Sequence, residues 1–251
     1  MPRSCLATGA LLGAVLAATQ AHAQSGFPDR LTGEVGVGAF ARSGIVRGVG
    51  GSVTPLPYVY ADFGRFFARV DTLGVKNVPL GRGHLEVVAR VSTEGFDADG
   101  PALRGLGDRR NPVPVGVGTM QRTPLGAFFV YATHDLSSGG AFLEATWGAR
   151  VDAGPVALFP LLGLEHRGGA YVRQLYGIDA AESAASGRPA YRPGASTVAM
   201  AGLAASLPLS GPWALQLQWR HRWLDGAIGR SPIVDRRSQH SGHLALTYEF
   251  R

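Results

Sequence analysis

The chain has 251 residues, of which 45% are hydrophobic and 17% charged, and its formal net charge is +6 at pH 7. This positive charge does not indicate a nucleic-acid-binding protein, because the basic residues form no run with interleaved aromatic side chains. The alternatives are attraction to anionic lipid headgroups or envelope polymers, and a plain compositional preference for arginine.

The first residues have the pattern of a cleaved secretory signal. Arg3 supplies a positive charge, residues 6–18 form an uncharged apolar run, and Ala21-His22-Ala23 has the small-x-small form of a signal-peptidase site. The run is too short for a membrane-spanning helix, which needs about 20 apolar residues. We therefore expect residues 1–23 to be a signal peptide and residues 24–251 to be one exported domain. The single cysteine would leave with the signal, so we expect no disulfides.

Segments in which apolar and polar residues alternate recur along the rest of the chain. A period of two is typical of strands with one apolar and one polar face. The predicted strands are 32–41, 53–63, 66–72, 85–93, 113–120, 126–133, 141–151, 156–166, a stretch from 197 that ends at Pro208, 213–222 and 241–250. The pattern gives about eleven strands, and single-chain bacterial barrels have an even number, so we predict twelve, with ten as the alternative. The alternation is weakest at residues 73–83, where glycine and proline obscure it.

The last predicted strand, 241–250, indicates the class of fold. Its apolar face carries Leu244, Leu246, Tyr248 and Phe250, so the strand places an aromatic residue almost at the C-terminus. A strand of this length can cross a bilayer, and no apolar segment after the signal is long enough for a spanning helix. We therefore predict an all-β protein, a transmembrane antiparallel β-barrel of the bacterial outer membrane that contacts outer-membrane lipid. Its expected interfacial aromatic girdle is Trp213, Trp219, Trp223 and Tyr248.

Charged residues of these strands are expected on the inner face, because a lipid-facing surface cannot hold charge cheaply. Both signs are present, so we expect the charges to pair across the lumen. They form either a structural network that fills a narrow barrel or the lining of a channel for anions or sugars. The predicted lumen-facing charges are Arg69, Asp71, Glu86, Arg90, Glu144, Arg150, Glu165, Arg220, Arg222 and Glu249.

Three long connections, 94–111, 167–195 and 225–239, and the end of the last strand carry distinctive local patterns. The patterns are Leu103-Arg104-Gly105-Leu106-Gly107-Asp108-Arg109, Leu175-Tyr176-Gly177-Ile178, Tyr191-Arg192-Pro193-Gly194-Ala195, Ser231-Pro232-Ile233-Val234 and the terminal Leu246-Thr247-Tyr248-Glu249-Phe250. In order and spacing they resemble the MipA/OmpV family of MltA-interacting proteins across essentially the whole mature chain. One departure is Arg251, since the assembly signal of such barrels usually ends on the aromatic itself. Within these patterns, Tyr176, Gly177, Ser231 and Pro232 are expected to shape the loops.

The resemblance implies an outer-membrane barrel that acts as a scaffold and not as an enzyme. The best-known member of the family joins a lytic murein transglycosylase to a murein synthase, so the implied partners are such a transglycosylase and a bifunctional penicillin-binding protein. Other members are discussed as adhesins or small-solute pores. A narrow channel or a surface adhesin is therefore the alternative function. If the last strand runs down to the periplasm, the second and third long connections face outside the cell.

Two motifs have the spacing of cofactor or metal sites. Residues 36–41 fit G-x-G-x-x-A, but these glycines lie inside a strand pattern, where small residues at a barrel wall are the better interpretation. His240 and His243 are three residues apart, and on a strand this spacing directs two side chains to opposite faces. We therefore predict no cofactor and no metal site from these motifs.

A lipid A-modifying barrel enzyme is the weakest alternative. It would need a nucleophile and a base at one rim of the barrel. Candidate side chains near strand ends are His134, Asp135, Ser137, Ser138 and His166, and there is no G-x-S-x-G nucleophile elbow. Polar residues at strand ends are also common as plain rim residues, so we predict no catalytic residue.

Overall fold

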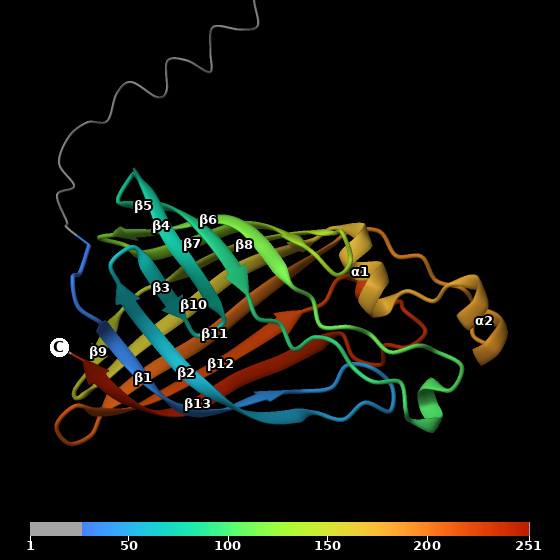
Figure 1. Cartoon of the computed structure of the whole chain (residues 1–251). Coiled ribbons are helices and arrows are strands. Elements are labelled where there is room, and N and C mark those ends of the chain that lie inside the picture. Colours follow the sequence, from blue (N-terminus) through green and yellow to red (C-terminus); the bar gives the residue numbers. More distant parts are fainter. Residues whose placement is uncertain (1–26, 251) are drawn as a thin grey trace, which may run out of the picture.

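The alternating segments form β-strands that join in one antiparallel sheet (Figure 1). The computed structural model describes residues 27–250, so the predicted signal peptide, residues 1–23, lies outside the described residues. The strands are β1 Thr32–Arg42, β2 Ser52–Phe63, β3 Phe66–Arg69, β4 Thr72–Leu80, β5 Gly83–Arg90, β6 Pro114–Thr123, β7 Gly126–Asp135, β8 Ala141–Gly148, β9 Val151–Ala153, β10 Val156–Arg167, β11 Ser196–Pro208, β12 Trp213–Trp223 and β13 Ser238–Phe250.

The sheet closes on itself, because β1 pairs with β13 and β10 pairs with both β8 and β11. β8 and β9 are two parts of one wall strand, since both pair with β10. The ladder between them is interrupted beside Pro160, which has no N–H to donate to a neighbouring strand. Counted in this way, the described chain forms a closed barrel of twelve antiparallel strands, which confirms the predicted fold and strand number.

The strand that the alternation did not resolve is β4, in the segment where glycine and proline obscured the pattern. The expected strand 66–72 is too long, because β3 ends at Arg69 and the chain reverses at Val70 and Asp71 into β4. Val70 has a φ of 57°, a left-handed conformation that a β-branched residue rarely adopts. Asp71 is therefore a turn residue and not a strand residue.

The polarity of the two faces of the barrel wall is the reverse of that in a water-soluble protein. Apolar side chains such as Val37 and Leu162 are exposed on the outside, while Glu86, Glu165 and Thr247 are at most 2% exposed. A surface of this kind suits a hydrocarbon solvent, because lipid solvates apolar groups and not charges. The four residues of the predicted aromatic girdle are all exposed: Trp213, Trp219, Trp223 and Tyr248.

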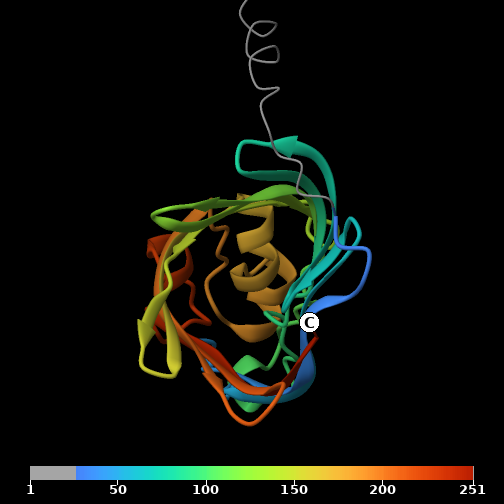
Figure 2. The same cartoon turned by 90° about the vertical axis from the view of Figure 1, so that its left-hand side faces the viewer.

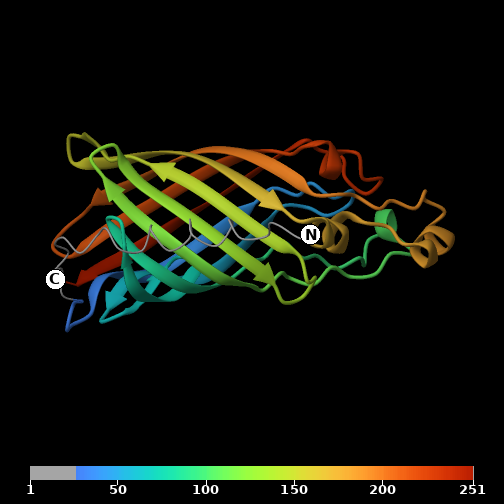
Figure 3. The ribbon, with the colours of Figure 1, turned by 90° about the horizontal axis from the view of Figure 1, so that it is seen from above.

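The connections divide the barrel into two different ends (Figures 1 and 3). We call the end with residues 43–51, 91–113, 136–140, 168–195 and 224–237 the loop end. The other end, where short turns join the strands and the chain reaches its C-terminus, is the turn end (Figure 1). The helical segments all lie in loop-end connections: 3₁₀ helix Pro101–Leu103, α1 Gly169–Tyr176, α2 Ala180–Ser186 and α3 Gly226–Gly229. Within residues 27–250, every helix is too short or too polar to cross a membrane.

A view along the barrel axis shows the helix-bearing connections lying across the ring of strands (Figure 2). Their apolar side chains meet in the largest hydrophobic cluster of the described chain, the loop core. It contains Ile45, Val46, Leu103, Phe142, Tyr171, Val172, Leu175, Tyr176, Ile178, Val198, Leu224, Ile228, Ile233 and Val234. Only Phe142 and Val198 of this set belong to wall strands. The connections therefore fold over the barrel mouth and build a core of their own.

Candidate functional site

The interior of the barrel and the loop-end connections that cover it form the candidate functional site, because the charged and buried polar residues gather there. The first charged cluster joins three strands through Arg69 of β3. Arg69 donates two hydrogen bonds to the Glu86 carboxylate, at 2.8 and 2.7 Å, and a third to the Tyr131 hydroxyl at 3.0 Å. Its guanidinium carbon also lies 4.0 Å from the centre of the Phe67 ring. Such a two-point pair is strong and has a fixed geometry.

The second cluster is centred on Arg90 at the end of β5. Its guanidinium bridges the carboxylates of Asp71, at 2.9 Å, and of Glu144 on β8. Thr146 donates a further hydrogen bond to Glu144 at 2.9 Å. Because Asp71 lies in the short β3–β4 turn, Arg90 ties this turn to the neighbouring strand β5 and, through Glu144, to β8.

The third cluster connects the wall strands to the loop-end connections. Glu165 on β10 accepts hydrogen bonds from Arg167 at 2.7 Å and from Arg222 on β12 at 2.8 Å. Arg167 also pairs with Glu94 of the 91–113 connection at 2.8 Å, and the Tyr171 hydroxyl of α1 donates to the same Glu94 at 3.0 Å. Glu94, Arg167 and Tyr171 were absent from the predicted set, although Arg167 shares the face of Glu165 two positions earlier.

Arg220 is the one predicted inner-face cation that forms no ion pair with another described residue. Three carboxylates act on it electrostatically, those of Asp71, Glu144 and Glu165, and its buried Nε has no hydrogen-bond partner among residues 27–250. Together with Arg69, Arg90, Arg167 and Arg222 it balances the five carboxylates of Asp71, Glu86, Glu94, Glu144 and Glu165. The charges of this set therefore cancel.

Two of the predicted lumen-facing charges lie outside these clusters. Arg150 lies in the interruption between β8 and β9, its side chain is 63% exposed, and it pairs with the similarly exposed Asp152 at 2.8 Å. Glu249 is exposed near the end of β13. Both lie toward the turn end, where the wall strands leave the packed interior, so alternation along a strand does not by itself place a residue in the buried network.

The predicted loop-shaping residues meet one another. The Ser231 hydroxyl donates to the Tyr176 carbonyl at 2.7 Å, and both residues are buried, so the connections 168–195 and 224–237 are joined at this point. Gly177 ends α1, and a Cβ there would lie 2.5 Å from the Arg173 carbonyl, so the close approach requires glycine. The Pro232 carbonyl accepts from Arg47 of the β1–β2 connection at 3.1 Å.

A charged contact joins the 91–113 connection to α2. Arg109 donates to both carboxylate oxygens of Glu182, at 2.7 and 3.0 Å, and the Gly107 N–H donates to it at 2.9 Å. Burial opposes ionisation of Glu182, but these donors outweigh that effect and hold its pKa below the usual value. Glu182 also completes the capping box of α2 with Asp179. Arg109 and Glu182 therefore hold two long connections together.

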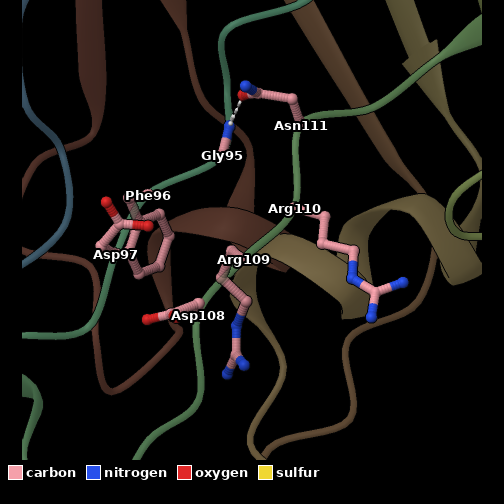
Figure 4. A pocket seen from close by; sticks show the side chains of 7 residues that line it. All are labelled: Gly95, Phe96, Asp97, Asp108, Arg109, Arg110 and Asn111. Atoms are coloured by element: carbon pink, nitrogen blue, oxygen red, sulfur yellow. Dashed lines mark hydrogen bonds between the residues drawn. The ribbon is translucent and has the colours of Figure 1, made fainter.

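The same connection borders a hollow of about 640 Å³ at the loop end (Figure 4). It is lined by Gly95, Phe96, Asp97, Asp108, Arg109, Arg110 and Asn111, and the Gly95 N–H donates to the Asn111 side chain across it at 2.9 Å. Charges of both signs line the hollow, and Arg109 is already engaged by Glu182. The hollow therefore shows no preference for one class of ligand.

Neither candidate histidine lies in the hydrogen-bonded group that Asp135 forms with Ser137 and Ser138. His134 and His166 are exposed on the outer face, whereas Asp135 is fully buried and accepts hydrogen bonds from Ser137, Ser138 and the Val113 N–H. Asp135 thus organises the 136–140 turn. His240 is exposed and His243 is buried on the inner face, as their spacing predicted.

The glycines of the 36–41 motif lie in β1. A Cβ on Gly36 would lie 2.0 Å from the Leu246 carbonyl of β13, so glycine allows close pairing at the seam that closes the barrel. This contact supports the wall interpretation of the motif.

Comparisons with known proteins identify a matching family model and two similar proteins. A family model described as MltA-interacting protein MipA matches residues 35–250. The proteins named MltA-interacting protein of Escherichia coli (strain K12) and Shigella flexneri are each 26% identical to this chain over 156 residues. The alignment covers 61% of this chain and 63% of each relative, so the chain spans less than two thirds of the length of the curated relatives it matches.

Proposed function

The chain belongs to the family of the MltA-interacting protein MipA, and on that premise we propose that it is a non-enzymatic outer-membrane scaffold for murein-remodelling enzymes. Its proposed partners are a lytic murein transglycosylase and a bifunctional penicillin-binding protein. The observation that carries the proposal is the family match over residues 35–250, which covers almost the whole described barrel. The name of the two relatives, MltA-interacting protein, supports the first partner.

The ion pairs of the interior and the loop core favour a scaffold over a channel. Paired charges occupy the inner face, and the long connections cover the barrel at the loop end. A conducting lumen needs unpaired polar groups along a continuous aqueous path, whereas these groups bind one another. We therefore place the functional surface at a rim of the barrel and not in its lumen.

The turn end is the proposed docking face. Outer-membrane barrels turn short connections to the periplasm and long loops outward, so murein enzymes would reach only the turn end. Exposed arginines stand there at or beside three tight turns, namely Arg65, Arg82 and Arg122. Such a rim would attract an acidic partner surface and accelerate its docking.

In-cell crosslinking of the tagged barrel, followed by mass spectrometry of the captured proteins, tests the scaffold. We expect enrichment of a lytic transglycosylase or a bifunctional penicillin-binding protein. Capture of the barrel-assembly machinery alone would contradict the proposal and favour the channel and adhesin alternatives, which liposome swelling and surface-binding assays would then separate.

A pair of charge-removing triple variants locates the docking face. The variant Arg65→Ser/Arg82→Ser/Arg122→Ser should lose partner capture. The matched control is Arg104→Ser/Arg110→Ser/Arg236→Ser, which removes three exposed arginines from the loop end and should retain capture. Heat-modifiable migration on a gel confirms that each variant has folded. Equal capture by both variants would exclude a basic docking face at the turn end.

A further inference from the structure

Two histidines meet on the outer face of the barrel near the loop end. His221 of β12 and His240 of β13 are directly opposite each other in the strand register, and both rings lie on the solvent- or lipid-exposed side. Their Nδ1 atoms are 3.4 Å apart and their ring centres 4.5 Å apart. His240 thus has an imidazole partner on the neighbouring strand, whereas His243, its neighbour in sequence, faces the interior.

The separation of the two nitrogens matches joint coordination of one metal ion. Imidazole nitrogens bind Zn²⁺ at about 2.0–2.1 Å, and two such bonds at a tetrahedral angle place the nitrogens about 3.3–3.4 Å apart. The same distance is long for a hydrogen bond, for which donor and acceptor are usually about 3.0 Å apart. The two imidazoles therefore form only a weak hydrogen bond with each other, and both are well placed to bind one metal ion.

Neighbouring indoles orient both rings. Trp219 stacks on His240 with ring centres 5.8 Å apart, and Trp223 meets His221 edge to face at 4.5 Å. The His240 backbone N–H donates to the Ser43 hydroxyl at 2.9 Å, which ties this part of β13 to the β1–β2 connection. Rings that are held in place lose little conformational freedom when they bind an ion.

We propose that His221 and His240 form a two-imidazole binding site for a divalent transition-metal ion. Imidazole ligands favour Cu²⁺, Ni²⁺ and Zn²⁺ over Mg²⁺ or Ca²⁺, and Cu²⁺ binds most tightly in this series. Within residues 27–250, no three His, Cys, Asp or Glu side chains converge, so the protein supplies two ligands to the ion. The site is open and exchangeable, unlike a closed structural zinc site.

A bound ion would link β12 to β13 at the loop end. These strands flank the 224–237 connection, and β13 closes the barrel against β1. Binding to the folded state alone stabilises that state, so the ion should raise the unfolding temperature in a concentration-dependent way. This inference does not depend on the scaffold proposal.

Titration of the detergent-folded full mature chain with CuSO₄, after removal of any purification tag, tests the site. Quenching of tryptophan fluorescence reports binding, because Trp219 and Trp223 contact the two rings. Electron paramagnetic resonance reports the nitrogen ligands. We expect one Cu²⁺ per chain with two imidazole nitrogens, and at least about tenfold weaker binding in His221→Ala and in His240→Ala.

His166→Ala is the matched control. His166 is exposed near the same rim, but its Nδ1 lies 3.0 Å from the Thr197 hydroxyl and not beside a second imidazole. This variant should bind Cu²⁺ like the unaltered chain, and heat-modifiable migration confirms folding of all three variants. Absence of binding by the unaltered chain, undiminished binding by His221→Ala and His240→Ala, or an equal loss in His166→Ala would overturn the proposal.

Discussion

The loop end and the turn end share the same wall strands but are held together by different forces. At the loop end, long connections bury apolar side chains such as Val172, Ile228 and Ile233 completely, as a water-soluble protein would. At the turn end, connections of a few residues leave apolar side chains such as Leu125 and Leu209 exposed. Pairing between neighbouring strands satisfies the backbone hydrogen bonds of the wall at both ends of the barrel. A further hydrophobic core can form only where the connections are long enough to supply apolar side chains.

The largest difference between the two ends should appear when a carboxylate is removed. Glu165→Ala leaves Arg167 and Arg222 buried without their shared partner, which should cost about 3–5 kcal/mol. Asp152→Ala at the turn end breaks an exposed pair and should cost about 0–1 kcal/mol. Urea unfolding of the barrel in lipid vesicles measures both. Equal losses would show that the buried clusters add nothing to the stability of the wall.

A cavity in the loop core should destabilise the loop-end connections but not the wall strands. Leu175 is 1% exposed, and Leu175→Ala should cost about 2–4 kcal/mol of local packing energy. Limited proteolysis should then cleave the 168–195 connection faster, while circular dichroism still reports the intact sheet. Leu209→Ala, at a half-exposed position of the turn end, should leave the cleavage rate unchanged. Unfolding of the whole barrel by Leu175→Ala would contradict a separate loop core.

Acid should loosen the loop end through Glu182. Its pKa in the folded chain is lowered, so the stabilisation it provides is present above its ordinary value of 4.5 and is lost as the pH falls through the lowered value. Hydrogen exchange at the Gly107 N–H should therefore accelerate in acid. Glu182→Gln should lower the free energy of opening at Gly107 by about 1 kcal/mol, so exchange should be faster already at pH 7. The variant should also show no further acceleration in acid. An unchanged acid response in this variant would assign the effect to another group.

The smallest effects concern two turns with nearly the same backbone angle. Val70 has a φ of 57° and Gly64 a φ of 56°. Val70→Gly should stabilise the barrel by up to about 1 kcal/mol by relieving strain, and Gly64→Val should destabilise it by about 1–2 kcal/mol. Thermal unfolding of the two variants measures both signs. Destabilisation by Val70→Gly would show that packing of the valine side chain outweighs the strain.

The sequence by itself determined the class of fold and the faces of the wall. Period-two alternation is a local property of an extended backbone, so Leu217 and Trp219 could be assigned to the outside, and Glu144 and Glu165 to the inside, without knowledge of neighbours. The even-number rule then corrected the count from about eleven to twelve. The family resemblance rested on motifs in the long connections and is confirmed by the match over residues 35–250.

Only the tertiary structure decided which residues meet. Strand register placed His221 opposite His240, and the pairing of β10 and β12 with the same strand β11 brought Arg222 to Glu165 across 57 positions of sequence. The interruption beside Pro160 left Arg150 exposed although its position in the alternation suggested otherwise. Register, closure and the folding of loops over the mouth depend on contacts between distant segments. A pattern within one segment cannot contain that information.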